Sequence, residues 1–445
     1  MDYRGKKILI LGMAREGTDS LRYFLKHHPS LEIAAADRLE PQKLGESARE
    51  LLKNNPQIRY FGGNGYLSAI DDYDLAVKSP GVPIHLPEIE AAFKQNKITS
   101  QSEIFFNECP GKIIGVTGTK GKSTTASIIY AILQRAGKKV FLLGNIGEPM
   151  LSYLDAGDKE TFFVCELSAH QLYNLKQSPA AAVWLNIYPE HLDYYNNYNE
   201  YILAKANIAL HQSKGDYFIY NSAIPEIAAI AAKSPAQKIA FNEYDWNFSG
   251  KTKLIGDFNM QNAKVGAIIG RLFGVTDEII NAAIENFKPL DNRLEFVGSF
   301  AGIDCYNDSL STIQESAVAA ISALGDRVKI LIAGGFDRGQ PFDKLAAAIL
   351  SGSIETLILF LPTGSRIWQE IENQAATLGK QERLAGLKHY FAQTMEEAVD
   401  LVFENGKNGQ ICLLSAASAS FGGFADYADR GHRFKECLIA RAKIN

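Results

Sequence analysis

Short runs of β-branched and other apolar residues alternate with longer helical patterns from one end of the chain to the other. This alternation is typical of βαβ units, in which helices connect parallel strands and cover the sheet. The sequence therefore predicts an α/β fold with parallel sheets. The predicted strands are KILIL (7–11), LEIAAA (31–36), DLAVK (74–78), KIIGVT (112–117), TFFVCEL (161–167), AAVWLN (181–186), DYFIYN (216–221), GIDCYND (302–308), VKILIAG (328–334), TLILFL (356–361) and QICLLSA (410–416).

The length of the chain favours several domains. At roughly 150 residues per domain, 445 residues correspond to about three domains, and 46% hydrophobic residues suffice to give each domain a core. Prolines at 80, 83 and 87 close the first block, and the second block runs into a loop at residues 288–290. The predicted domains are residues 1–100, 101–290 and 291–445.

Charge and cysteine content exclude several classes of protein. Lys and Arg total 46 against 50 Asp and Glu, the net charge is -4, and no block of like charge occurs, so nucleic acid and anionic membranes are not expected partners. The 5 cysteines form no C-x-x-C pair, which argues against a zinc site or a disulfide framework. The amino-terminal apolar run is far shorter than the roughly 20 residues of a membrane span. We expect a cytoplasmic monomer.

The strongest local motif is GVTGTKGKST at residues 115–124, between a predicted strand and a helical pattern. It departs by one residue from the phosphate-loop pattern G-x-x-x-x-G-K-[ST], because Val116 stands where that pattern has glycine. Gly118 and Gly121 still allow backbone N–H groups to face phosphate oxygens, and the helix amino terminus adds a positive dipole. The motif therefore predicts a site for nucleotide phosphates.

Polar side chains of the same motif suit a nucleotide with magnesium. Lys122 can neutralise the β and γ phosphates, and the hydroxyl of Ser123 or Thr124 can bind the metal ion. The alternative is a glycine-rich turn capped by Thr119, but such a turn requires neither the lysine nor the hydroxyl. The predicted ATP contacts in the loop are Gly118, Thr119, Lys120, Gly121, Lys122, Ser123 and Thr124.

Spaced motifs along essentially the whole chain resemble those of the Mur ligases, which add amino acids to peptidoglycan precursors. The motifs are TGTKGKST (117–124), GNIG (144–147), ELSAHQ (166–171), NIYPEHLD (186–193), GDFNMQNA (256–263), NRLE (292–295), YNDS (306–309) and GG (334–335). The resemblance implies a Rossmann-like amino-terminal domain that holds a uridine nucleotide, a central ATP-binding domain with a parallel sheet, and a Rossmann-like carboxy-terminal domain.

The resemblance is greatest to the glutamate-adding branch of this family. It implies that ATP phosphorylates the carboxylate of UDP-N-acetylmuramoyl-L-alanine and that glutamate attacks the acyl phosphate, with two Mg²⁺ ions and a carbamylated lysine at the site. The implied ATP contacts outside the loop are Asn145, Asn259, Asn262, Arg293 and Asp308. The implied substrate contacts are Asp37, Arg38, Ser79, Ser168, Gln171, Thr312, Arg338, Ser420 and Tyr427. Phe258 replaces the usual histidine of the GDFNMQNA motif and leaves that contact open.

The same resemblance implies that Lys122, His191 and Lys205 are catalytic and that Ser123, Glu166, His191 and the Lys205 carbamate bind magnesium. Each has an ordinary alternative. Glu166 is also compatible with a solvated strand end, His191 with a hydrogen-bonding surface residue in an acidic turn, and Lys205 with a helical lysine that extends into solvent. Carbamylation needs a neutral amine, so a lowered pKa of Lys205 in a crowded site is part of the prediction.

One departure bears on which glutamate is added. Most D-glutamate-adding relatives read DSKATN, whereas this chain reads DSLSTI at 308–313, so Leu310 replaces a lysine. With AREG at 14–17, PEH at 189–191 and GGFDRG at 334–339, this resembles a variant branch that adds L-glutamate, with Arg338 and Thr312 as carboxylate partners. The sequence thus favours L-glutamate, with D-glutamate as the alternative.

Two further functions stay open at this point. Folylpolyglutamate synthase also adds glutamate on a similar ATP domain, but it lacks the uridine domain, which residues 37–38 and 79–81 indicate here. A non-catalytic phosphate-loop module would not require Glu166, His191 and Lys205 together. Both alternatives are therefore less favoured than a Mur ligase.

Overall fold

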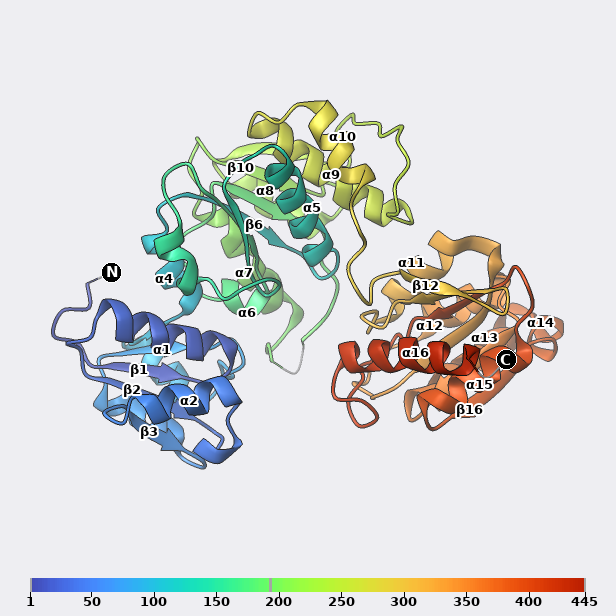
Figure 1. Cartoon of the computed structure of the whole chain (residues 1–445), viewed down its shortest axis with the longest axis horizontal. Helices are drawn as coiled ribbons and strands as arrows, with labels where there is room; N and C mark the ends of the chain where they lie inside the picture. Colours follow the sequence, from blue (N-terminus) through green and yellow to red (C-terminus); the bar gives the residue numbers. More distant parts are fainter. Residues whose placement is uncertain (1, 192–193, 444–445) are drawn as a thin grey trace. The chain divides into compact units, whose positions relative to one another are not determined.

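The computed structural model describes residues 2–191 and 194–443. The chain forms two compact units, one of Met1–Gly250 with Gln261–Glu285 and one of Lys251–Met260 with Asn286–Asn445 (Figure 1). The first unit contains two sheets and the second unit contains one. The division of the first unit into two domains at residue 100 stays a prediction.

The first sheet is parallel, with the strand order β3-β2-β1-β4-β5. Gly17 allows the first helix to pack closely on this sheet, because a Cβ there would lie 1.7 Å from the carbonyl oxygen of Gly12. The elements are β1 (Ile8–Leu11), α1 (Arg15–His27), β2 (Ile33–Asp37), α2 (Glu46–Asn54), β3 (Arg59–Gly62), β4 (Leu75–Lys78), α3 (Pro87–Lys94), β5 (Ile98–Thr99) and α4 (Gln101–Glu108).

The second sheet is also parallel, in the order β11-β10-β9-β6-β8-β7. Its central strand β6 pairs with β8 and β9, with Val116 beside Glu166 and Thr117 beside Trp184. The carboxyl ends of these three strands, one of which is the predicted site residue Glu166, therefore meet at one edge of the sheet. The elements are β6 (Lys112–Thr117), α5 (Lys122–Arg135), β7 (Val140–Gly144), η3 (Leu151–Ala156), β8 (Phe162–Glu166), α6 (Ala169–Leu172), β9 (Ala181–Trp184), α7 (Tyr198–Leu210), β10 (Tyr217–Tyr220), α8 (Pro225–Lys233), β11 (Gln237–Ala240), α9 (Asp257–Leu272) and α10 (Asp277–Glu285).

The third sheet has the order β12-β13-β17-β14-β15-β16 and is parallel except for β12, which adds an antiparallel edge. The elements are β12 (Glu295–Phe300), β13 (Ile303–Asn307), α11 (Gln314–Leu324), β14 (Val328–Gly334), α12 (Asp343–Ser351), β15 (Thr356–Phe360), α13 (Thr363–Leu378), α14 (Gln381–Ala385), β16 (Lys388–Ala392), α15 (Met395–Asn405), β17 (Ile411–Leu414) and α16 (Tyr427–Ala442).

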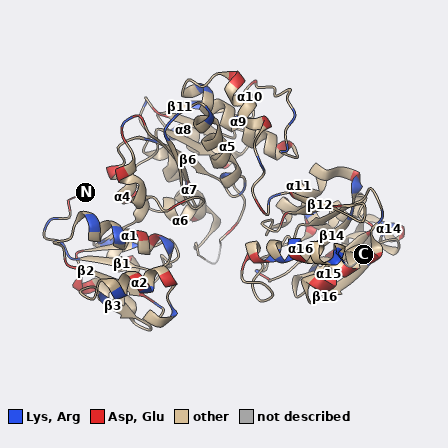
Figure 2. Cartoon of the chain, in the orientation of Figure 1, with Lys and Arg blue, Asp and Glu red and all other residues tan. Residues whose placement is uncertain are grey.

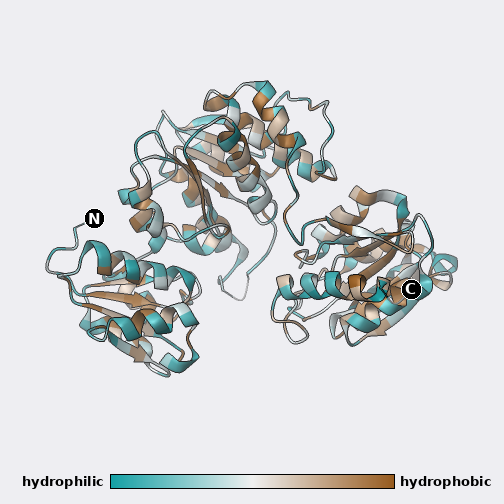
Figure 3. Cartoon of the chain, in the orientation of Figure 1, coloured by the Kyte–Doolittle hydropathy of each residue, from teal (hydrophilic) through white to brown (hydrophobic). Residues whose placement is uncertain are grey.

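Apolar side chains concentrate in the strands, and polar ones on the outer faces of the helices (Figure 3). Positive and negative side chains are interspersed over each part of the chain, as the sequence predicts (Figure 2). Within the described ranges, none of the helices combines the length and the apolar character needed to cross a lipid bilayer.

Candidate active site

The phosphate loop connects β6 to α5 and is held by an asparagine from a neighbouring strand end. The Asn186 side-chain oxygen accepts hydrogen bonds from the N–H groups of Thr119 (3.0 Å) and Lys120 (2.8 Å), and its amide donates to the Lys120 carbonyl (2.9 Å). Gly121 has φ 84°, and a Cβ there would lie 2.8 Å from the Asn262 side-chain oxygen, so only glycine fits. Asn186 opens the NIYPEHLD motif, but the motif alone did not predict this role.

Two of the predicted ATP contacts, Asn259 and Asn262, lie on the same helix, α9, but in different compact units. Asn262 accepts a hydrogen bond from the Thr125 hydroxyl at 3.1 Å, which places its side chain against the phosphate loop. Asn259 donates to the carbonyl of Ile255 at 2.9 Å, within the second unit.

The lysines of the loop are held by acceptors of the protein itself. The Lys122 ammonium donates to the Thr119 carbonyl at 3.0 Å, and the Lys120 ammonium contacts the Glu190 carboxylate at 3.1 Å. Burial opposes ionisation of Glu190, but Lys120, His191 and Lys122 outweigh it and lower the pKa of Glu190 to about 2. Glu190 is therefore an anion beside the loop.

His191 directly follows Glu190 and has a left-handed backbone, with φ 59°. Its ring meets the ring of His170 edge-on at 4.8 Å, and its Nε2 lies 3.7 Å from Glu190 Oε2. The side chain is 39% exposed, so it is accessible at the edge of the site. Leu192 and Asp193 of the same motif lie outside the described residues.

Glu166 ends β8 and is 1% exposed, so the alternative of a solvated strand end is wrong. Asn145 donates to Glu166 Oε1 at 3.0 Å, whereas the buried Oε2 has no hydrogen-bond partner among the described residues. An unpaired buried carboxylate oxygen is costly, and a hard cation such as Mg²⁺ would satisfy it. The described residues contain no group of three or more His, Cys, Asp and Glu arranged around a metal position. Glu166 can therefore supply one ligand of the predicted Mg²⁺ ion. The Ser123 hydroxyl and a modified lysine would have to supply others.

Lys205 lies on α7 and is 1% exposed, so it does not extend into solvent. Its ammonium donates to the Gly118 carbonyl at 2.9 Å, lies 3.4 Å from the Thr117 hydroxyl, and stands 4.9 Å from the centre of the Tyr201 ring. Burial, followed by the nearby Lys122, lowers the pKa of Lys205 far below its usual value. The amine thus has the depressed pKa that carbamylation requires.

A cavity of about 570 Å³ lies between the first two sheets and contains the predicted substrate residue Asp37 in its wall. The Asp37 carboxylate accepts hydrogen bonds from the N–H groups of Met13 (2.7 Å) and Leu39 (2.9 Å), so it orders the loop after β1. Ser79 is buried and donates to the Gly12 carbonyl at 2.8 Å, whereas Arg38 is exposed. Ser79 therefore ties two strand ends together rather than facing the cavity.

Ser168 and Gln171 form a capping box at the start of α6. The Gln171 side-chain oxygen accepts from the Ser168 N–H at 2.9 Å, and its amide donates to Glu16 Oε1 at 2.7 Å. Both ends of the Gln171 amide are thus engaged within the protein, in contacts that orient the end of β8.

In the second unit, Asp308 directly follows the buried strand β13, and its carboxylate is enclosed. It accepts hydrogen bonds from the Leu294 N–H (3.2 Å) and from the hydroxyls of Ser311 and Ser415 (2.9 Å for Ser415). Burial raises the pKa of Asp308 to about 6, although these hydrogen bonds and the nearby Arg293 oppose the shift. Arg293 and Asp308, predicted as ATP contacts, are therefore neighbours.

The predicted glutamate-site residues of the second unit differ in exposure. Thr312 is half-buried and Ser420 is buried, whereas Arg338 and Tyr427 are exposed. The Arg338 guanidinium stands 5.4 Å from the centre of the exposed Phe421 ring. No hydrogen bond joins these predicted residues to one another in the contacts described.

Arg430 on α16 is fully buried, and sequence analysis assigned no role to it. Its guanidinium donates to the hydroxyl (2.9 Å) and carbonyl (2.7 Å) of Ser309 and to the carbonyl of Ser418 (3.1 Å). It thereby joins the loop after β13 to the loop after β17, which carry Thr312 and Ser420. Its only sequence signal is the Arg430-Gly431 pair beside Tyr427.

A phosphate loop at the edge of a parallel sheet, facing a buried carboxylate and a buried lysine, defines a nucleotide-dependent enzyme of the phosphate-loop class. Residues 116–249 match the family described as Mur ligase middle domain. The chain is 32% identical to a UDP-N-acetylmuramoylalanine--D-glutamate ligase of Symbiobacterium thermophilum, over 98% of both chains. The chain therefore belongs to the Mur ligase family and is an ATP-dependent amino-acid ligase.

Solved structures share this fold. A UDP-N-acetylmuramate-alanine ligase MurC from Thermotoga maritima matches with a TM-score of 0.59 at 17% identity, over 98% of this chain and 100% of that chain. A MurF ligase from Thermotoga maritima in complex with ADP matches with a TM-score of 0.58 at 14% identity, over 99% of this chain and 97% of that chain. The predicted architecture is therefore confirmed.

Proposed function

We propose that this chain joins glutamate to UDP-N-acetylmuramoylalanine through an acyl phosphate formed from ATP. The observation that carries this proposal is the meeting of buried Glu166 and buried Lys205 at a phosphate loop. The relative matched over 98% of both chains is named for this reaction and supports the substrate class. A match of that extent also disfavours the folylpolyglutamate alternative, which lacks the region of the first sheet.

The phosphate loop would hold ATP by its backbone and two lysines. The N–H groups at the start of α5 and the Lys122 ammonium face the position of the β and γ phosphates. Lys120 would exchange its contact with Glu190 for a phosphate oxygen, since both partners are anions. Positive charge at this point stabilises the charge that develops on the transferring phosphoryl group.

Ser123, Glu166, His191 and a carbamate on Lys205 are the proposed magnesium ligands. Magnesium held there would supply positive charge that neutralises the phosphates of ATP. The Lys205 ammonium would first lose one proton, and the neutral amine would then attack carbon dioxide and lose a second proton, so that a cation becomes a carbamate anion. The lowered pKa of Lys205 supports this step, because the attacking amine must be neutral.

In the proposed reaction, a carboxylate oxygen of the substrate attacks the γ phosphorus of ATP and ADP leaves. The glutamate amine, after losing a proton, attacks the acyl carbon, and phosphate leaves with the electrons of the broken C–O bond. Exclusion of water protects the acyl phosphate. The cavity that contains Asp37 is the proposed site of the uridine nucleotide, which would place the substrate between the first and second sheets.

We propose D-glutamate as the amino acid, because the relative at 32% identity is named for it. The L-glutamate expectation from the sequence has no support among the relatives. One observation keeps L-glutamate as the second candidate: the half-buried Leu310 occupies the loop position where most D-glutamate-adding sequences have lysine. A carboxylate that loses a charged partner typically loses about 2–5 kcal/mol of binding.

The test is phosphate release by the purified chain with UDP-N-acetylmuramoyl-L-alanine, ATP and glutamate, each omitted in turn. D-glutamate and L-glutamate are assayed separately, and mass spectrometry identifies the product. We expect release only with all three substrates and a higher kcat/KM for D-glutamate. Release that is independent of the uridine nucleotide would contradict the proposed substrate, and a higher kcat/KM for L-glutamate would select the second candidate.

A further inference from the structure

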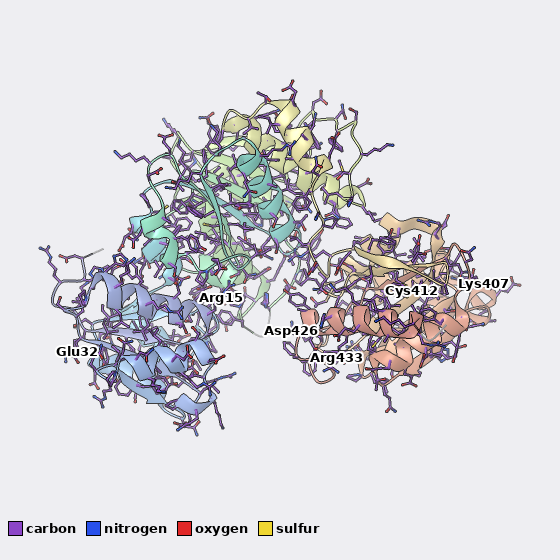
Figure 4. All side chains as sticks on the ribbon, in the orientation of Figure 1. Arg15, Glu32, Lys407, Cys412, Asp426 and Arg433 are labelled. Atoms are coloured by element: carbon purple, nitrogen blue, oxygen red, sulfur yellow. The ribbon has the colours of Figure 1, made fainter. Side chains whose placement is uncertain are left out.

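Two consecutive residues in the first turn of α1 reach across to the second sheet. The Arg15 guanidinium donates to the carbonyls of Gly147 (3.0 Å) and Gly144, and Figure 4 labels Arg15 on the ribbon of the first sheet's helices. Glu16 accepts the hydrogen bond from Gln171 at 2.7 Å. The sequence singles out these residues as part of AREG, yet the proposed reaction gives them no part.

The loop that Arg15 holds contains two glycines that no other residue could replace, and it carries the predicted ATP contact Asn145. Gly144 (φ 100°) and Gly147 (φ 74°) are both left-handed, and a Cβ on either one would meet a backbone oxygen at 2.4 Å or less. These conformations turn both carbonyls toward one guanidinium, whose planar fork suits two acceptors. Between them, Asn145 donates to Glu166. Arg15 is thus linked, through one loop, to the buried carboxylate.

Glu16 holds the other side of the same strand end. Its partner Gln171 is the capping-box residue that bonds to the Ser168 N–H. β8 ends at Glu166, only two residues before Ser168. Arg15 and Glu16 therefore bind two segments beside Glu166, the Gly144–Gly147 loop and the start of α6, to the first turn of α1.

The same turn forms part of the wall of the cavity between the two sheets. Ala14 and Arg15 line it from α1 and its start, and Glu148 and Pro149 line it from the segment after the Gly144–Gly147 loop. A substrate that extends from this cavity to Glu166 must pass the hydrogen bonds by which Arg15 and Glu16 join α1 to the segments of the second sheet. Reacting atoms must come within roughly 3–3.5 Å, and an error of about 1 Å costs on the order of 100-fold in rate.

We propose that Arg15 and Glu16 are positioning residues that set the separation between the nucleotide cavity and the reacting carboxylate. This proposal rests on the proposed function for its substrate. They touch the Gly144–Gly147 loop and Gln171, and act on the reaction through those segments. Removing either one leaves ATP binding at the phosphate loop intact and misplaces the substrate carboxylate.

The kinetic test compares Arg15→Ala, Glu16→Ala and Glu16→Gln with the parent enzyme. We expect Arg15→Ala and Glu16→Ala to lower kcat roughly 10- to 100-fold, with a smaller change in the KM for ATP, because the phosphate loop keeps its own contacts. Glu16→Gln retains the acceptor for Gln171 and should keep most of the activity. A kcat within twofold of the parent for both alanine variants would overturn the proposal.

The matched control is Lys26→Ala. Lys26 lies on the same helix and also crosses the junction, since its ammonium contacts Asp155 of η3, but this ion pair is exposed and lies near the other end of α1. We expect activity close to that of the parent. An equal loss of kcat in Lys26→Ala and Arg15→Ala would mean that loss of any contact between α1 and the segments of the second sheet lowers kcat. This result would overturn the positioning role of Arg15.

Amide hydrogen exchange tests, without relying on activity, whether Arg15 stabilises the Gly144–Gly147 loop. The N–H groups of Gly144, Asn145 and Glu148 are hydrogen-bonded within the loop region, so they report its opening. We expect them to exchange about tenfold faster in Arg15→Ala and at the parental rate in Lys26→Ala. Unchanged exchange in Arg15→Ala would overturn the proposal, whereas a parent enzyme that releases no phosphate would overturn the proposed function alone.

Discussion

Among the described residues, Lys205 of the first unit and Arg430 of the second unit are both almost fully buried near predicted site residues, and their hydrogen bonds differ greatly. Lys205 in the first unit is 1% exposed and donates to a single carbonyl, with a hydroxyl at 3.4 Å. Arg430 in the second unit is 0% exposed and uses all three of its nitrogens to donate to Ser309 and Ser418. One cation is poorly satisfied and the other is fully enclosed by acceptors.

The difference follows from the acid–base chemistry of the two side chains. Burial, followed by Lys122, brings the pKa of Lys205 far down, so this amine loses its proton instead of gathering acceptors. Burial lowers the pKa of Arg430 only to about 10, so the guanidinium stays charged and needs its hydrogen bonds. Lys205 is therefore suited to react as a neutral amine, and Arg430 is suited to join two loops through its hydrogen bonds.

The largest expected effect comes from Lys205→Met. Methionine keeps the length and removes the amine, so the proposed carbamate cannot form and ligation should fall roughly 10³-fold or more. The melting temperature should not fall, because a poorly satisfied polar group is removed from the core. Short carboxylates should restore part of the activity. A ligation rate within tenfold of the parent would show that Lys205 is not needed for the reaction. It would contradict the distinction between a chemical role for Lys205 and a structural role for Arg430.

Arg430→Met should affect stability in the opposite way. It leaves the carbonyls of Ser309 and Ser418 and a hydroxyl without a donor, at about 1–3 kcal/mol for each buried group. We expect the second unit to lose about 3 kcal/mol of unfolding free energy, or about 6–12 °C in calorimetry. The control is Arg433→Met on the same helix (Figure 4), which breaks an exposed pair with Asp429 and should cost about 1 kcal/mol or less. Equal losses in the two variants would contradict the role of Arg430.

The buried carboxyl group of Asp308 can be compared with these two buried basic groups. Burial raises the pKa of Asp308 to about 6 in the folded chain, from 3.8. Folding therefore favours its protonated form, so this contribution to stability is complete below about pH 4 and is lost as the pH rises through 6, by about 3 kcal/mol. Asp308→Asn should match the parent near pH 3.5 and exceed its unfolding free energy by about 2–3 kcal/mol at pH 8. Urea unfolding at the two pH values measures this, and a pH-independent difference would argue against a raised pKa.

The smallest expected effect is on specificity. Leu310 follows Ser309, which Arg430 holds, and its own N–H donates to the Asn292 carbonyl at 3.1 Å. Leu310→Lys should therefore add a cation to an otherwise fixed loop. We expect the ratio of kcat/KM for D-glutamate over L-glutamate to rise roughly tenfold, which corresponds to about 1.4 kcal/mol. An unchanged ratio would indicate that this position does not contact glutamate.

The sequence predicted the interior of each sheet and missed the edges. In the described part of the chain, every strand predicted from an apolar run lies inside a sheet, and the strands that were not predicted, β3, β5, β7, β11, β12 and β16, are the sheet edges. Edge strands pair on one side, and most of these include partly exposed residues, such as β11 with two exposed positions. The sequences of these strands, apart from VFLLG in β7, therefore lack the continuous apolar run that marks an interior strand.

The site was predictable where a motif is local and less so where it depends on distant contacts. The phosphate loop is one continuous segment, and Gly121 could be assigned from it. The burial of Lys205 was not evident from its helix, because it depends on Gly118, far away in the sequence. Arg15, Asn186 and Arg430 act on backbone groups of distant loops, and such contacts leave no residue pattern near the side chain that makes them.

The Asn186 amide has a consequence for how nucleotides bind. Fixing the backbone of one flexible residue costs about 1–2 kcal/mol in conformational entropy at 25 °C, and Asn186 fixes two residues of the phosphate loop with three hydrogen bonds before ATP arrives. That cost is met when the chain folds, so it is not subtracted from the affinity for ATP at each turnover.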